Sequence, residues 1–174
     1  MVKPEHIPIF SSWIDKKDSS HYNKNKSPYK FNLLYRASRD GKTAAAFHNK
    51  CDNKGATVVI AKFLNSEKII GGYNPLFWDS SNGHKSTNDS FIFSFADRNN
   101  LQSAKVGYYN NNQYAIVCNS KFGPIFGGGS GDLVCNNDGT WYGYPNKSYP
   151  KIDDVQNVNH FKVDDYEVFQ VVKM

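Results

Sequence analysis

The chain has 174 residues, a net charge of +5 and an aromatic content of 15%. This length fits one domain with a substantial core, and the high aromatic content excludes a disordered chain. The chain contains no apolar stretch of roughly 18 residues, and its basic residues do not alternate with aromatic ones, so neither membrane insertion nor nucleic-acid binding is expected.

The N-terminal third of the chain predicts two helices with a strand between them. Residues 4–14 are expected to contain the first helix, and a polar loop follows at residues 15–28. A strand is expected at residues 30–36, a turn at 38–41 and the second helix at 43–51. Phe10 and Trp13 recur at helical spacing in the first helix, which we expect to begin near Pro8. Three consecutive alanines favour the second helix, and either Asp40 or Thr43 can cap its start.

From residue 56 onward, β-branched and aromatic residues predict strands. They are expected at residues 56–63, 68–73, 90–95, 104–109, 114–118, 132–135 and 166–172. The segment 90–95 alternates serine with apolar residues, which is typical of a strand with one buried face. Because helices and strands do not alternate, a parallel sheet is not expected. The expected fold class is mostly β with flanking helices, a β-sandwich of two antiparallel sheets.

The stretch FGPIFGGGSGDLVC (122–135) can be interpreted as a phosphate-binding loop or as a turn between strands. No lysine follows the glycines, and Asp132 occupies the last position of the dinucleotide-binding pattern. The segment that follows predicts a strand and not a helix, so no helix N-terminus is available for a phosphate. We therefore expect a structural turn made by glycines. The pair Gly71-Gly72 similarly predicts a bulge or a close backbone approach at a strand end.

The histidines and cysteines are not arranged at metal-ligand spacing, so no metal and no cofactor is expected. His48 and Cys51 lie three residues apart in a predicted helix, and we interpret them as a surface imidazole beside a half-buried thiol. An odd number of cysteines without a secretory signal predicts reduced thiols and an intracellular protein of the cytoplasm or nucleus.

Acidic residues offer two interpretations. They lie at Asp40 in a turn, at Asp132 after the glycines, and at Asp164, Asp165 and Glu167 near the C-terminus. Paired carboxylates can carry out acid–base catalysis. The simpler interpretation is that Asp40 caps a helix and that the others lie at solvated strand ends.

Several blocks of the chain, taken in order, resemble the TLDc domain. They are LLYRASRDG (33–41), FHNKCDNKG (47–55), KIIGGYNPLFW (68–78), SFIFSF (90–95), FGGG with DL (126–133) and YEVFQV (166–171). The resemblance implies a TLDc-like domain over residues 28–174, a sandwich flanked by helices. Residues 1–27 would form an N-terminal helix and connector, because PEHIPIFSSWID resembles the segment before this domain in BTB-and-TLDc proteins.

The resemblance also implies a function. Members of the family are associated with resistance to oxidative damage, and several bind the vacuolar proton-pumping ATPase. We therefore expect a non-catalytic domain that binds a protein partner, with this ATPase as the expected partner. The alternative is an enzyme, peroxide-consuming or hydrolytic, that uses surface acids or thiols.

Acidic and glycine positions in the shared motifs are the candidate functional residues. Carried onto this chain, they are Asp40, Gly41, Gly71, Gly72, Asp89, Gly127, Gly128, Asp132 and Glu167. The chain departs from some members that have glutamate at positions 89 and 132. Several relatives lack Cys51, so a thiol mechanism common to the family cannot depend on it.

Overall fold

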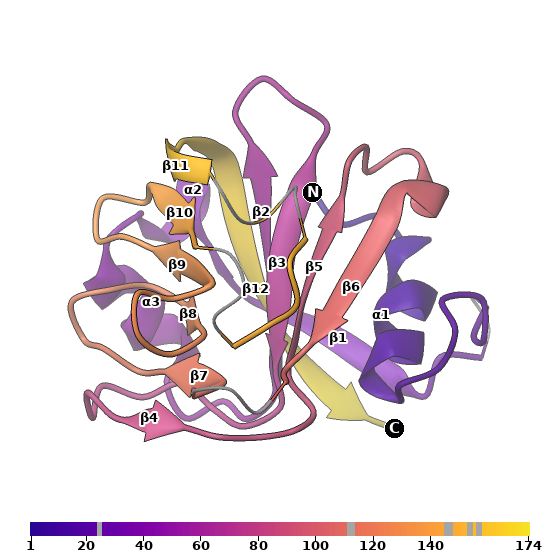
Figure 1. Ribbon diagram of the computed structural model, residues 1–174, viewed down its shortest axis with the longest axis horizontal. Coiled ribbons are helices and arrows are strands. Elements are labelled where there is room, and N and C mark those ends of the chain that lie inside the picture. Colours follow the sequence, from indigo (N-terminus) through magenta and orange to yellow (C-terminus); the bar gives the residue numbers. More distant parts are fainter. Residues whose placement is uncertain (24–25, 111–113, 145–147, 153–154, 156–157) are drawn as a thin grey trace.

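The computed structural model describes residues 1–23, 26–110, 114–144, 148–152, 155 and 158–174. Within these residues, two antiparallel sheets of six strands each form the domain (Figure 1). The first sheet contains, in spatial order, β1 (Tyr29–Arg36), β12 (Val163–Lys173), β2 (Thr57–Phe63), β3 (Ile69–Asn74), β5 (Phe91–Phe95) and β6 (Ala104–Tyr108). The second contains β11 (Val158–Phe161), β10 (Trp141–Gly143), β9 (Leu133–Cys135), β8 (Ile125–Phe126), β7 (Ile116–Val117) and β4 (His84–Lys85). The expected antiparallel sandwich is confirmed.

The first sheet is apolar on both faces. Side chains alternate along β2, so Val59 and Ala61 join the core between the sheets, whereas Val58 and Ile60 join a second core on the outer face. Both apolar faces of the first sheet must be shielded from water, and the second sheet can shield only one of them.

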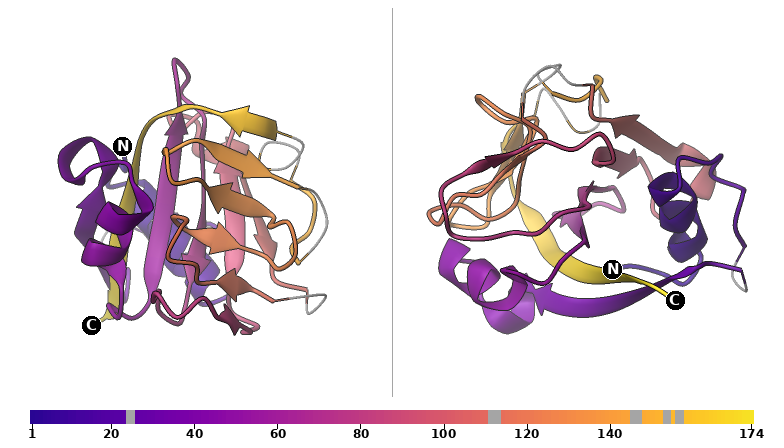
Figure 2. Two further views of the ribbon diagram at one scale, coloured as in Figure 1. Left: turned by 90° about the vertical axis from the view of Figure 1, so that its left-hand side faces the viewer. Right: turned by 90° about the horizontal axis from the view of Figure 1, so that it is seen from below.

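Helix α1 (His6–Ile14) covers the outer face of the first sheet. Phe10 and Trp13 pack on β5, with ring centroids 5.0 Å apart for Phe10 and Phe93 and 6.0 Å apart for Trp13 and Phe91. Figure 2 shows α1 and the second sheet on opposite sides of the first sheet. Strand β5 is therefore buried on both faces, and the expectation of one buried face for 90–95 was wrong.

Helix α3 (Ala44–Cys51) packs on the side of the second sheet. Its start is capped by Thr43, whose hydroxyl oxygen accepts a hydrogen bond from the Ala46 amide at 3.2 Å. Phe47 places its ring edge-on to Tyr35 of β1, with centroids 6.0 Å apart. The helix thus joins the core between the sheets.

Two short helices were not predicted from the sequence. A turn was expected at residues 38–41, but the chain forms the single helical turn α2 (Ala37–Asp40) there, which ends at Gly41. A 3₁₀ turn, η1 (Leu101–Ser103), leads into β6. The expected glycine turn does connect β8 and β9, and the Gly131 amide donates to the Gly128 carbonyl at 3.1 Å within it. In the part of the chain that the structure describes, no helix has the length and apolar character to cross a membrane.

Candidate functional site

Two candidate acids meet where β1 ends and α2 begins. Arg36 and Glu167 are paired across β1 and β12, and both Nε and Nη2 of Arg36 lie 2.7 Å from Oε1 of Glu167. Glu167 is only 1% exposed, so its carboxylate depends on this guanidinium. The second oxygen, Oε2, lies 3.8 Å from the amino nitrogen of Met1. The expected solvated position for Glu167 was therefore wrong.

Asp40 is joined to the same arginine through the backbone. Its Oδ2 accepts a hydrogen bond from the Arg36 amide at 2.9 Å, which caps the start of α2 and explains why a helical turn forms there. The Arg39 guanidinium donates to both oxygens of the carboxylate, at 3.0 and 2.7 Å. These contacts, with the Arg39 hydrogen bonds as the largest cause, lower the pKa of Asp40 to about 2. Asp40 caps α2 and not the start of α3.

We expect acid to weaken the fold through Asp40. Because its pKa falls from 3.8 to about 2 on folding, its contribution is fully present above about pH 4 and is lost as the pH falls toward about 2. Asp40→Asn should therefore flatten the dependence of the unfolding free energy on pH in this window. Arg39→Gln should flatten it in part. An unchanged slope for Asp40→Asn in urea titrations at several pH values would contradict this role.

Gly41 follows Asp40 and completes the corner. Its φ of 102° lies in the left-handed region, and its carbonyl accepts a 2.5 Å hydrogen bond from the Tyr35 hydroxyl. The glycine is thus required by the backbone of the corner.

Asp132 is fully buried and is held by the segment that begins at Ser148. Its Oδ2 accepts from the Ser148 amide at 2.9 Å and its Oδ1 from the Tyr149 amide at 3.3 Å. A Cβ at Gly127, whose φ is 93°, would lie 2.1 Å from Oδ2 of Asp132, and the Gly128 amide donates to the Ser148 hydroxyl at 3.0 Å. The glycine turn therefore wraps a carboxylate of its own chain and not a phosphate.

The candidate acids do not converge in one cleft. Tyr166 and Val168 of β12 point into the core between the sheets, so Glu167, which lies between them, faces the opposite side of the first sheet. Asp132 precedes β9 in the second sheet. The first sheet thus separates Asp132 from Glu167, whereas Asp40 lies at the end of β1 with its Oδ1 4.0 Å from the ammonium of Lys50 in α3.

The family model of the TLDc domain matches residues 8–172, nearly the whole chain. The chain belongs to the TLDc domain family. A search of curated proteins found no match.

The paired glycines of this TLDc domain lie inside β3 and not at its end. A Cβ at Gly71 would lie 1.9 Å from the Val59 carbonyl oxygen of β2, and a Cβ at Gly72 would lie 2.7 Å from the Phe126 ring of the second sheet. The expected close approach is confirmed, but it occurs in mid-strand. Both glycines serve the packing of β3 against its neighbours.

Asp89 differs from the other acids of the TLDc motifs because it is exposed. Its side chain is 63% exposed and its Oδ1 lies 2.9 Å from the ammonium of Lys16. Such a surface pair contributes little to stability. Among the nine candidate positions, Asp89 is the acid whose carboxylate is most accessible to a partner.

His48 was expected at the surface, but it is buried. Its Nδ1 lies 2.7 Å from Oδ1 of Asp52, and its Nε2 lies 3.0 and 2.9 Å from the carbonyl oxygens of Asn119 and Phe122. The Ser80 hydroxyl donates to the other oxygen of Asp52 at 2.7 Å. In a catalytic triad the histidine lies between carboxylate and nucleophile, whereas here the carboxylate lies in the middle. The cluster therefore joins α3 to the 119–122 turn. The spacing of His48 and Asp52, four residues apart at the end of a helix, is the feature of the sequence that could have predicted their contact.

The three cysteines are free and buried. Burial raises the pKa of the thiols of Cys51, Cys118 and Cys135, which disfavours the reactive thiolate. Among the described residues, no group of three or more His, Cys, Asp or Glu side chains is placed to hold a metal ion.

Thiol reactivity should follow from this burial. We expect the native TLDc domain to react with a colorimetric disulfide reagent far more slowly than free cysteine, and to release the signal of all three thiols only in denaturant. A thiol that reacts in the native protein at the rate of free cysteine would contradict this expectation.

Proposed function

We propose that this TLDc domain contributes to resistance against oxidative damage by docking on a protein partner, the vacuolar proton-pumping ATPase. The proposal rests on one observation: the carboxylates of the motif acids are already bound by groups of the domain itself. Glu167, Asp40 and Asp132 hold arginine side chains and backbone amides of their own chain, and the first sheet lies between Glu167 and Asp132. This separation favours binding through the outer surface of the folded domain over catalysis by paired acids in one cleft.

The enzymatic alternative lacks a comparable observation. A general base needs to reach a proton of the substrate, and a peroxide-consuming thiol needs an accessible thiolate. Asp132 and Glu167 are buried, and so are the three thiols. The choice of the ATPase as partner rests on family membership.

The direct test uses the purified domain and the isolated cytosolic sector of the vacuolar ATPase. We expect saturable binding in biolayer interferometry at physiological ionic strength. An unrelated β-sandwich protein of similar net charge serves as the control. Absence of saturable binding, or equal binding by the control, would contradict the choice of partner. Peroxide consumption by the purified domain above that of the cysteine-free variant would instead support the enzyme.

A further inference from the structure

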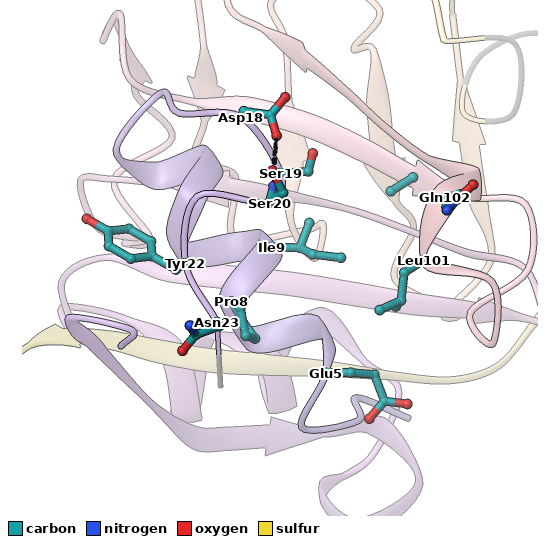
Figure 3. Close-up of a pocket in the computed structure, with 11 residues that line it drawn as sticks. Glu5, Pro8, Ile9, Asp18, Ser19, Ser20, Tyr22, Asn23, Leu101 and Gln102 are labelled. Atoms are coloured by element: carbon teal, nitrogen blue, oxygen red, sulfur yellow. Dashed lines mark hydrogen bonds between the residues drawn. The ribbon is translucent and has the colours of Figure 1, made fainter. Parts of the chain in front are cut away.

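A pocket of about 460 Å³ opens between α1, the polar loop that follows it and the start of β6 (Figure 3). None of the candidate positions named from the TLDc motifs lines it. The lining residues are Glu5, Pro8, Ile9, Asp18, Ser19, Ser20, Tyr22, Asn23, Leu101, Gln102 and Ala104. This volume falls in the range of about 300–1,000 Å³ that is typical of binding pockets.

The floor of the pocket is apolar and fixed. Pro8 and Ile9 come from the first turns of α1, and Leu101 and Ala104 come from η1 and the first residue of β6. Ile9 belongs to the core cluster under α1, so its position is set by the packing of the helix on the first sheet. A fixed apolar floor favours an apolar anchor from a partner.

Two carboxylates lie at opposite ends of this floor. Figure 3 shows Asp18 beside Ser20 at one end and Glu5 at the other, with Ile9 and Leu101 between them. The Ser20 amide and hydroxyl donate to Oδ1 of Asp18 at 2.9 and 2.6 Å and lower the pKa of this carboxyl, so it is charged at neutral pH.

The lining contains neither lysine nor arginine, although the whole chain carries a net charge of +5. Several lysines lie close by in the sequence but are not among the lining residues, namely Lys3, Lys16, Lys17 and Lys105. Lys3 donates to the Asn99 side chain at 2.6 Å, and Lys16 pairs with Asp89. The charged residues of the lining itself are therefore both acidic, which makes the lining complementary to a cationic segment.

We propose that this pocket binds a segment of a partner protein in which an apolar side chain is flanked on both sides by lysine or arginine. The apolar side chain packs on Ile9 and Leu101, and the basic side chains reach Asp18 and Glu5. The side-chain amide of Gln102 at the rim can form hydrogen bonds to the peptide backbone, and the Ser19 hydroxyl, which accepts a hydrogen bond from the Trp13 indole nitrogen at 2.9 Å, can donate one. This proposal rests on the proposed docking function and states what kind of partner surface it uses.

The first experiment measures fluorescence anisotropy with two labelled synthetic peptides. One has a pair of leucines flanked by arginines, and the other has glutamates in place of the arginines. We expect the arginine peptide to bind at least about tenfold more tightly. Equal affinity of the two peptides would overturn the proposal.

Substitutions in the pocket test whether the arginine peptide binds there. The double variant Glu5→Lys with Asp18→Lys should weaken the arginine peptide by about tenfold, and Ala104→Phe should block it by filling the floor. Asp164→Lys, which reverses an exposed carboxylate paired with Lys62 at the start of β12, is the matched control and should leave the affinity unchanged. Thermal unfolding of each variant checks that it is folded. Equal loss in the control, or no loss in both pocket variants, would overturn the proposal.

The same variants separate this inference from the proposed function. If the ATPase sector binds the wild type and the folded pocket variants equally, the pocket is not the docking site, although the docking function remains. If the arginine peptide depends on the pocket but the ATPase sector does not bind, the choice of partner fails and the pocket remains. Self-association of the domain that the double variant abolishes would identify a second copy as occupant and overturn the inference.

Discussion

Replacing Gly71 with alanine is expected to destabilise the domain by at least about 3 kcal/mol. The added Cβ would lie 1.9 Å from the Val59 carbonyl oxygen and 2.7 Å from the Phe93 ring. The first of these neighbours is backbone of the adjacent strand β2, so it cannot turn aside as the end of a flexible side chain can. Strands β2 and β3 would have to separate in the middle of the first sheet, and we expect this loss in the free energy of urea unfolding.

Gly83→Ala is the matched control for this variant. Gly83 also has no left-handed backbone conformation, and its added Cβ would meet only the Ser81 hydroxyl at 3.0 Å. This hydroxyl donates to Asp79 at the surface, where water can replace that hydrogen bond if the hydroxyl rotates away. We expect a change below about 1 kcal/mol. If Gly71→Ala were as stable as Gly83→Ala, the close approach of β2 and β3 would not be a requirement of this fold.

Replacing Asp132 with alanine is expected to cost about 3 kcal/mol. The substitution removes the acceptor for the Ser148 and Tyr149 amides, which are buried at 2.9 and 3.3 Å from the carboxylate. It also leaves a space beneath the glycine turn, because Gly127 and Asp132 are in contact there. The measurement is again the free energy of unfolding.

Asp138→Ala provides the comparison for Asp132→Ala. Asp138 accepts hydrogen bonds from the Thr140 amide and hydroxyl in a turn of the same sheet, but it is exposed, so water can replace the carboxylate. Its loss should cost below about 1 kcal/mol. A cost for Asp132→Ala no greater than that for Asp138→Ala would mean that the buried carboxylate does not hold the 148–149 segment.

The long strands of the first sheet were predictable from the sequence because each has its own local signal. Strands β2 and β3 contain β-branched and aliphatic runs separated by a turn, and the predicted part of β12, residues 166–172, begins with alternating apolar and polar residues. The glycine turn was also predictable, since a phosphate loop needs a lysine and a following helix that this stretch lacks.

The rest depends on contacts between distant residues. Strands β4 and β8 have two residues each, which is too short for a period to be recognised. The burial of β5 on both faces comes from α1, which lies about eighty residues earlier in the chain. The pairing of Arg36 with Glu167 follows from the register of β1 and β12, which no local pattern gives.

We propose that the motif acids stabilise the TLDc fold and that the domain binds its partner through its outer surface. Asp132→Asn separates these two roles, because an amide group keeps the size of the carboxylate but places a donor against amide donors. The measurement is the affinity of this variant for the cytosolic sector of the vacuolar ATPase, at a temperature where circular dichroism shows it folded. We expect a lower melting temperature with an affinity within about twofold of the wild type. A fully folded variant whose affinity had fallen by about tenfold or more would contradict this proposal.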